Sequence, residues 1–178
     1  LPYTLEDSQG RVVAFDKHLL SMKDNDQSRN LRALIDAGIR SFKIEGRYKD
    51  MGYVKNVTAH YRTLLDEILN DQPDLHAASH GHCTYTFTPD TDKTFNRSST
   101  DYFATGRKMD IGAFDAPAHV GSKIGVVTRV AADWFEIDSP HTLANGDGLT
   151  WMHKREVKGT QADAVKRVGD VWRITPNQ

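Results

Sequence analysis

The chain has 178 residues, and its 23 lysines and arginines nearly balance 24 aspartates and glutamates, giving a formal net charge of -1. This balance excludes a protein that relies on a general basic excess to attract phosphate, although local basic patches remain possible. A hydrophobic content of 38% without a long apolar run predicts a soluble protein with no membrane span. The single cysteine, Cys83, excludes an internal disulfide and favours a reducing compartment such as the cytoplasm.

The first part of the chain carries the signals of β/α elements. Residues 3–15 combine two short apolar runs with a polar turn, which predicts a hairpin, and residues 19–21 are another candidate strand. Apolar residues at helical spacing predict a helix over 29–37, and Gly38 ends that pattern. The apolar run Ser41–Ile44 then predicts a short strand before the next helix.

The clearest predicted element is a long amphipathic helix from Asp50 to about Asn70. Asp50 suits the N-cap, and Pro73 lies just beyond the end. One apolar stripe runs down this helix at three- and four-residue spacing, which predicts a buried face. Its members are Val54, Val57, Tyr61, Leu64, Leu65 and Ile68.

The composition changes after this helix. Residues 70–81 are polar and rich in turn formers, so we place a boundary there, between a domain of residues 1–72 and a domain of residues 73–178. Residues 83–87 then alternate with a period of two, as in a strand. Further strands are predicted at 123–130, 134–138, 148–153 and 171–174. Short strands at this spacing favour a small, mostly antiparallel β-barrel or sandwich, and the chain as a whole is predicted to be α+β.

Glu45 and Arg47 are the first candidates for catalysis. They follow the predicted strand at its turn into the long helix, where open α/β sheets and (β/α) barrels assemble their sites. Glu45 could serve as an acid or base and Arg47 as an anion clamp. Lys43 could line the interior of a barrel or face solvent. The alternative is structural, with Arg47 pairing with an acid and Glu45 capping the helix.

A second candidate region is the polar block flanked by aromatic residues, Phe95–Phe103. Together with the basic residues that follow, it suits stacking on bases and contacts with phosphate. The predicted substrate-binding residues are Asn96, Arg97, Arg107 and Lys108. The alternative is an irregular loop that its aromatic residues pin to the fold while its charges face solvent.

Two other patterns predict no site. His80–Cys83 contains metal-binding residue types, but three ligands packed this closely rarely converge on one ion, so no metal site is predicted. A serine, a histidine and an aspartate occur in the chain without a nucleophile elbow, so no catalytic triad is predicted either.

Several blocks of the sequence resemble the collagenase-like peptidase family, peptidase family U32. The most specific block is Ala37–Arg47, and Leu19–Asp24 supports it. Weaker similarity covers much of the remaining chain. It lies at Leu1–Leu5, Tyr53–Val54, Tyr61–Arg62, Phe95–Arg97 and Gly146–Gly148.

The resemblance implies a larger protein with an N-terminal (β/α) barrel. The present chain would supply the last strand and helices of that barrel, followed by the accessory β domain. Some members are described as peptidases or collagenases, whereas others hydroxylate RNA and depend on iron–sulfur chemistry. The resemblance places the cysteines for such a cluster upstream of Leu1 and implies no cofactor within this chain, so the chain alone is expected to be inactive.

Three hypotheses follow. The leading one is RNA 5-hydroxylation of a cytidine of large-subunit ribosomal RNA, with the β domain aiding RNA binding. The second is a collagenase-like peptidase that acts on polypeptide, and the third is a binding module without catalysis. In each case we expect the missing barrel of the same chain as a partner, and the apolar surface left uncovered without it could lead to self-association.

Overall fold

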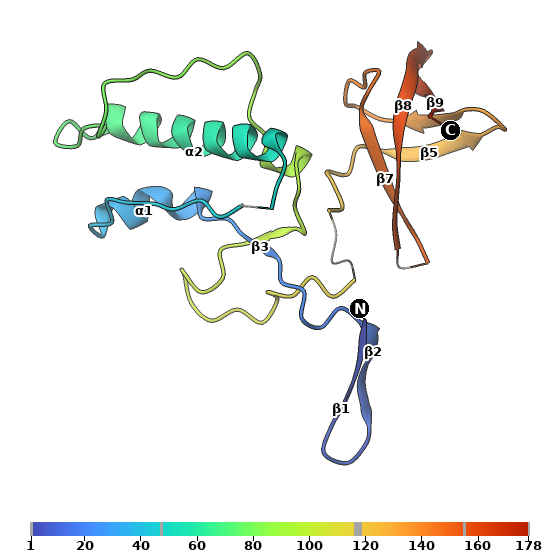
Figure 1. Ribbon diagram of the computed structural model, residues 1–178, viewed down its shortest axis with the longest axis horizontal. Coiled ribbons are helices and arrows are strands. Elements are labelled where there is room, and N and C mark those ends of the chain that lie inside the picture. The colour runs from blue at the N-terminus through green and yellow to red at the C-terminus, as the bar shows by residue number, and fades with distance from the viewer. Residues whose placement is uncertain (1, 47, 116–118, 155, 178) are drawn as a thin grey trace. The chain divides into compact units, whose positions relative to one another are not determined.

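The computed structural model describes residues 2–46, 48–115, 119–154 and 156–177 (Figure 1). Helices and strands both occur, so the predicted α+β class is confirmed. The contacts divide the chain into two compact units, Leu1–His119 (unit 1) and Val120–Gln178 (unit 2).

Unit 1 begins with the predicted hairpin, which is confirmed. Strand β1 (Tyr3–Glu6) pairs antiparallel with β2 (Val12–Lys17). The Asp7 carboxylate closes the turn by accepting the backbone N–H groups of Gln9 and Arg11 at 2.8 and 3.0 Å. The predicted strand at residues 19–21 is instead part of a turn, in which Ser21 N–H donates to the His18 carbonyl at 2.9 Å.

Two helices form the small apolar core of unit 1. Helix α1 (Leu31–Asp36) follows the 3-10 turn η1 (Ser28–Asn30), and the predicted long helix is confirmed as α2 (Met51–Asp71). The Asp50 side chain caps α2 by accepting the Tyr53 N–H at 2.7 Å. The two helices lie side by side (Figure 1). They pack through a buried cluster, which consists of Leu31, Ile35 and Ile68 with Tyr61, Leu64, Leu65 and Leu75 at its margin.

Two predicted strands of unit 1 do not form. Residues 39–46 have no regular structure, and neither do residues 82–85, which are followed by a bend at 86–87. Both segments have the apolar alternation of a strand, but a strand also needs a neighbour that completes its backbone hydrogen bonds. No such neighbour occurs among the described residues. Phe42 and Ile44 are consequently exposed.

The segment after α2 returns to the helices, so the predicted boundary at residues 72 and 73 falls inside unit 1. Buried Asn56 on α2 accepts the Asp90 N–H at 2.8 Å, and its amide donates to the Asp90 carbonyl and to the Thr94 hydroxyl. This contact holds the 3-10 turn η2 (Thr91–Lys93) against the helix. Farther along, β4 (Ser99–Thr100) pairs in parallel with β3 (Asp24–Asn25).

Unit 2 is one antiparallel sheet in the order β5-β6-β9-β8-β7 (Figure 1). Its strands are β5 (Val126–Val130), β6 (Phe135–Asp138), β7 (Gly148–His153), β8 (Glu156–Val168) and β9 (Val171–Pro176). All except β8 were predicted from the sequence. One face of the sheet carries the core of unit 2, which consists of Ile137, Leu143, Leu149, Ala162 and Ile174.

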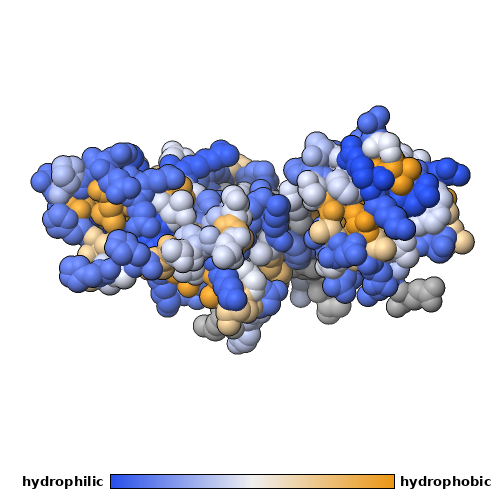
Figure 2. Space-filling model, turned by 90° about the horizontal axis from the view of Figure 1, so that it is seen from above, coloured by the Kyte–Doolittle hydropathy of each residue, from blue (hydrophilic) through white to orange (hydrophobic). Residues whose placement is uncertain are grey.

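Apolar side chains also remain on the surface. Figure 2 shows orange apolar patches among blue polar residues on the face that it presents. The exposed apolar side chains of unit 1 include Phe15, which is 66% exposed on the hairpin, and Met51 and Val54 at the start of α2. Among the residues that the structure describes, no helix has the length and apolar character needed to cross a bilayer.

Candidate nucleic-acid interface

Two of the predicted catalytic residues, Lys43 and Glu45, lie on the surface in the segment between α1 and α2. The Glu45 side chain is 68% exposed and forms an ion pair with Lys43, whose Nζ lies 3.0 Å from Glu45 Oε1. The Tyr53 hydroxyl donates to the Glu45 carbonyl at 3.3 Å and so ties this segment to α2. Arg47 lies outside the described residues, and its predicted role as an anion clamp therefore stays a prediction.

Arg97 is held by an acid far away in the sequence. Its Nη2 lies 2.8 Å from Asp24 Oδ1, and its backbone N–H donates to Asp24 Oδ2 at 2.8 Å. Both side chains are about two-thirds buried, at 29% and 31% exposure. One carboxylate thus fixes both the backbone and the guanidinium of Arg97 where β3 meets β4.

Cations and a histidine surround the neighbouring Phe95. Lys49 Nζ lies 3.0 Å from the centre of the Phe95 ring and Arg97 Cζ lies 5.6 Å from it, both cation–π contacts. The His119 ring stacks on Phe95 with centroids 6.0 Å apart. His119 Nδ1 accepts the Asn96 N–H at 3.0 Å, which leaves the proton of a neutral ring on Nε2.

Asp24 stands among these cations. Burial lowers the pKa of Lys49, Asp24 partly restores it and Arg97 lowers it further, so the net shift is downward. Burial also raises the pKa of Tyr53, and the negative charge of Asp24 adds to that shift. Asp24 therefore binds Arg97 and also attracts Lys49 electrostatically, in a partly desolvated setting.

Asn96 makes its hydrogen bonds within its own loop. Its amide donates to the carbonyls of Asp92 and Thr94 at 2.8 and 3.2 Å, and its carbonyl oxygen accepts the Ser98 N–H at 3.2 Å. These bonds shape the turn that carries Arg97. Asn96 thus organises the loop, although the sequence pattern predicts direct substrate binding.

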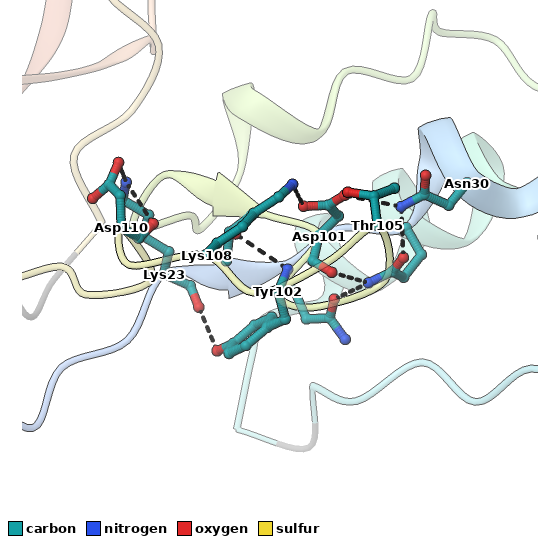
Figure 3. A network of polar contacts seen from close by, with 10 residues as sticks. Lys23, Asn30, Asp101, Tyr102, Thr105, Lys108 and Asp110 are labelled. Carbon is teal, nitrogen blue, oxygen red and sulfur yellow. Dashed lines mark hydrogen bonds and ion pairs between the residues drawn. The ribbon is translucent and has the colours of Figure 1, made fainter.

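Asp101 is the second carboxylate that neutralises a predicted RNA-binding cation. Lys108 forms an ion pair with Asp101 Oδ1 from one side, and the Asn30 amide donates to Oδ2 at 3.2 Å from the other (Figure 3). The Thr105 hydroxyl also donates to Oδ2, at 3.3 Å. The hydrogen bond from Lys108 is the largest cause of the lowered pKa of Asp101, and the bond from Asn30 comes next.

A further contact anchors the same loop. The Tyr102 hydroxyl donates to the Lys23 carbonyl at 2.9 Å, and Lys23 Nζ lies 2.6 Å from the Asp110 carboxylate (Figure 3). Arg107 is exposed. Of the three predicted basic contacts, Arg97 and Lys108 are each bonded to a carboxylate, whereas Arg107 faces solvent.

The comparisons with known proteins agree with the resemblance found in the sequence. Residues 1–113 match the model of Peptidase family U32. The chain belongs to this family.

The family includes relatives with two different named activities. The chain is 58% identical over 179 residues to the 23S rRNA 5-hydroxycytidine C2501 synthase of Escherichia coli (strain K12), an alignment that covers 100% of this chain and 27% of that protein. It is 26% identical over 144 residues to a collagenase of Porphyromonas gingivalis, covering 77% of this chain and 38% of that protein. The chain therefore spans about a quarter of the first relative. No solved structure matches it.

The peptidase name of the family directs attention to a serine and a histidine that lie in contact. Ser28 Oγ lies 2.9 Å from His60 Nε2, and the same hydroxyl is hydrogen-bonded to Asp26. Asp26 Oδ1 also accepts the Tyr61 hydroxyl at 2.9 Å. In a catalytic triad the carboxylate orients the histidine, whereas here it bonds the serine itself. These residues instead tie η1 to α2.

An iron–sulfur cluster, which the family resemblance implies for the larger protein, does not fit the residues of this chain. Such clusters are held by several cysteine thiolates, whereas Cys83 is the chain's single cysteine and is exposed. Among the described residues, no group of three or more His, Cys, Asp or Glu side chains is arranged to hold a metal ion.

Several residues of this region were not identified from the sequence. Lys49 and His119 contact Phe95, and Asp24 holds the neighbouring Arg97, although these residues are distant along the chain. Asp24 ends the family block Leu19–Asp24, but nothing in that block indicates Arg97 as its partner. Only the fold brings these residues together.

Proposed function

We propose that this chain is part of an enzyme that hydroxylates a cytidine of large-subunit ribosomal RNA at C5. The observation that carries the proposal is the 58% identity to the E. coli 23S rRNA 5-hydroxycytidine C2501 synthase across 100% of this chain. Hydroxylation of ribosomal RNA would place the protein in the cytoplasm. The collagenase alternative has less support, because that identity is 26% over 77% of the chain and Ser28, His60 and Asp26 lack the order of a triad.

Within this function we assign Glu45, Arg47 and Lys43 to the rim of the reaction site. The support is the position of Lys43 and Glu45 in the segment between α1 and α2 and the exposure of both side chains; Arg47 is included because it follows them in the sequence. Exposed Phe42 and Ile44 in the same segment also support a strand that pairs elsewhere in a longer polypeptide, as the last strand of a (β/α) barrel would. Any iron–sulfur cluster would need cysteines outside these 178 residues.

A chimera tests the proposed function directly. This chain would replace the matching segment of the E. coli synthase in a strain that lacks the native gene, and mass spectrometry of 23S rRNA would measure 5-hydroxycytidine. We expect the chimera to restore the modification. A chimera that accumulates as a folded protein without restoring it would contradict the proposal.

Two variants of the chimera test the assigned residues. Glu45→Gln keeps the size of the side chain and removes its charge, so we expect the modification to be lost if Glu45 acts in the reaction. Glu67→Gln, at an exposed position near the end of α2, is the matched control and should retain it. Equal activity of both variants would exclude a catalytic role for Glu45.

A further inference from the structure

Unit 2 has a second face that its core does not use. Across neighbouring strands, Arg129 of β5 pairs with Glu136 of β6, Glu136 pairs with Arg173 of β9, and Arg173 pairs with Lys166 of β8. Directly paired residues point to the same side of a sheet. These side chains therefore form one row across four strands, on the side opposite to core residues such as Ile137. We call this side the outer face.

An ion pair between Glu136 and Arg173 lies at the centre of the row. Glu136 is 9% exposed. It accepts two hydrogen bonds from Arg173 at Oε1, from Nε at 3.0 Å and from Nη2 at 2.7 Å. A guanidinium has five N–H donors, so this contact fixes the orientation of Arg173 while using only part of its donor capacity.

An indole ring lies beside the same row. Trp134, just before β6, has Arg173 Cζ 4.1 Å and Arg129 Cζ 5.2 Å from its ring centre. These cation–π contacts join an aromatic surface to two guanidinium groups. Aromatic rings and arginine planes are the groups on which proteins stack unpaired bases.

The charge of the outer face differs from that of the unit around it. Residues 120–178 contain eight lysines and arginines and seven aspartates and glutamates, which nearly cancel. The row, in contrast, has three cations and a single, largely buried carboxylate, and the exposed Asp138 is a second acid on the same face, two residues farther along β6. Local positive charge of this kind is complementary to phosphate.

We propose that the outer face of unit 2 binds single-stranded RNA, with Arg129, Lys166 and Arg173 contacting phosphates and Trp134 stacking on a base. This inference rests on the proposed function, because it makes ribosomal RNA the occupant of the face. Single-stranded RNA is favoured over a duplex, because a duplex keeps its bases stacked and presents mainly its shape and backbone.

The experiment uses the whole chain and a fluorescent single-stranded RNA oligonucleotide over a series of salt concentrations. Arg129→Gln combined with Lys166→Gln removes two exposed cations without disturbing Glu136. The slope of log K against log salt is negative, and each phosphate contact to a single strand contributes about 0.7 to its magnitude. We expect this double variant to reduce that magnitude by about 1.4. Lys154→Gln combined with Lys158→Gln, on the β7–β8 hairpin, is the matched control and should keep the original slope.

A second variant tests stacking separately from charge. Trp134→Leu should weaken binding by about tenfold while leaving the salt slope unchanged, and Trp134→Phe should restore most of the affinity because it retains an aromatic face. Tryptophan fluorescence and the circular dichroism of the sheet would show that each variant is folded.

The results separate this inference from the proposed function. If the chain binds RNA and both the charge variant and Trp134→Leu bind like the original, the outer face is not the RNA site, although the chimera can still restore hydroxylation. A chain that binds a polypeptide but not RNA would also overturn the inference. If, in addition, the chimera restores no 5-hydroxycytidine, the proposed function fails as well.

Discussion

The cations of the two units differ in how their charge is neutralised. In unit 1, Arg97 and Lys108 lie in a block whose composition suggests RNA binding, yet Asp24 and Asp101 bond them directly. On the outer face of unit 2, Arg173 is bonded to Glu136, whereas Arg129 and Lys166 form no ion pair with a described residue. The same residue types therefore have different roles. In unit 1 they organise a loop, whereas in unit 2 they leave positive charge available to a phosphate.

The largest expected effect is on the anchor of the outer face. Arg173→Ala should destabilise unit 2 by about 2–3 kcal/mol, because it leaves the carboxylate of Glu136 largely buried without a partner. The partial exposure of Arg173 reduces this cost below that of a fully buried pair. Urea unfolding followed by tryptophan fluorescence measures it, since Trp134, Trp151 and Trp172 all lie in unit 2.

The control for this prediction is Arg129→Ala. Arg129 contacts the same indole but is exposed, so its removal should cost less than about 0.5 kcal/mol. Equal destabilisation by the two variants would show that the Glu136 carboxylate does not need Arg173 to be stable in the folded unit. The outer face would then not be organised by this ion pair.

A smaller effect is expected when the neutralising acid is removed from unit 1. Asp24→Asn should cost about 1 kcal/mol, measured by the loss of helical circular dichroism in urea, because it weakens the hydrogen bonds to the backbone and guanidinium of Arg97. It should also make the slope of log K for RNA against log salt steeper by about 0.7, since Arg97 becomes available to a phosphate. An unchanged slope would mean that neutralisation by Asp24 is not what keeps Arg97 from RNA.

The smallest effect concerns pH. The pKa of Asp101 lies below its ordinary value of 3.8, chiefly because Lys108 hydrogen-bonds the ionised form. A lowered carboxyl pKa stabilises the folded state above the unfolded value, and this contribution disappears as the pH falls through the folded pKa. NMR titration of the Asp101 carboxyl group should therefore give a midpoint below 3.8. In a Lys108→Gln variant the midpoint should move upward, and a midpoint that did not move would contradict the role of Lys108.

Local patterns predicted the elements whose signals lie within a few residues. The apolar stripe and the N-cap Asp50 defined α2, and alternation with turn residues defined the hairpin and four strands of unit 2. Strand β8 was missed because its sequence, EVKGTQADAVKRV, is largely polar and contains Gly159. Its pairing with both β7 and β9 overrides that weak local preference.

Features that depend on distant partners could not be predicted. Residues 39–46 have the pattern of a strand, but a pattern cannot supply the neighbouring strand that its backbone needs. In the candidate interface, the residue types at Arg97 and Lys108 indicated phosphate binding. What decides their role is Asp24, 73 residues away, and Asp101, seven residues away. The sequence shows that Arg97 and Lys108 are cations, whereas only the fold shows which carboxylates neutralise them.

The most direct test compares the salt dependence of RNA binding for two charge-matched variants of the whole chain. Arg129→Gln with Lys166→Gln removes cations of the outer face, and Arg97→Gln with Lys108→Gln removes the cations that carboxylates neutralise. We predict that the first pair reduces the magnitude of the slope of log K against log salt by about 1.4 and that the second pair leaves it unchanged. The reverse result, with the slope lost only in the second pair, would contradict the account.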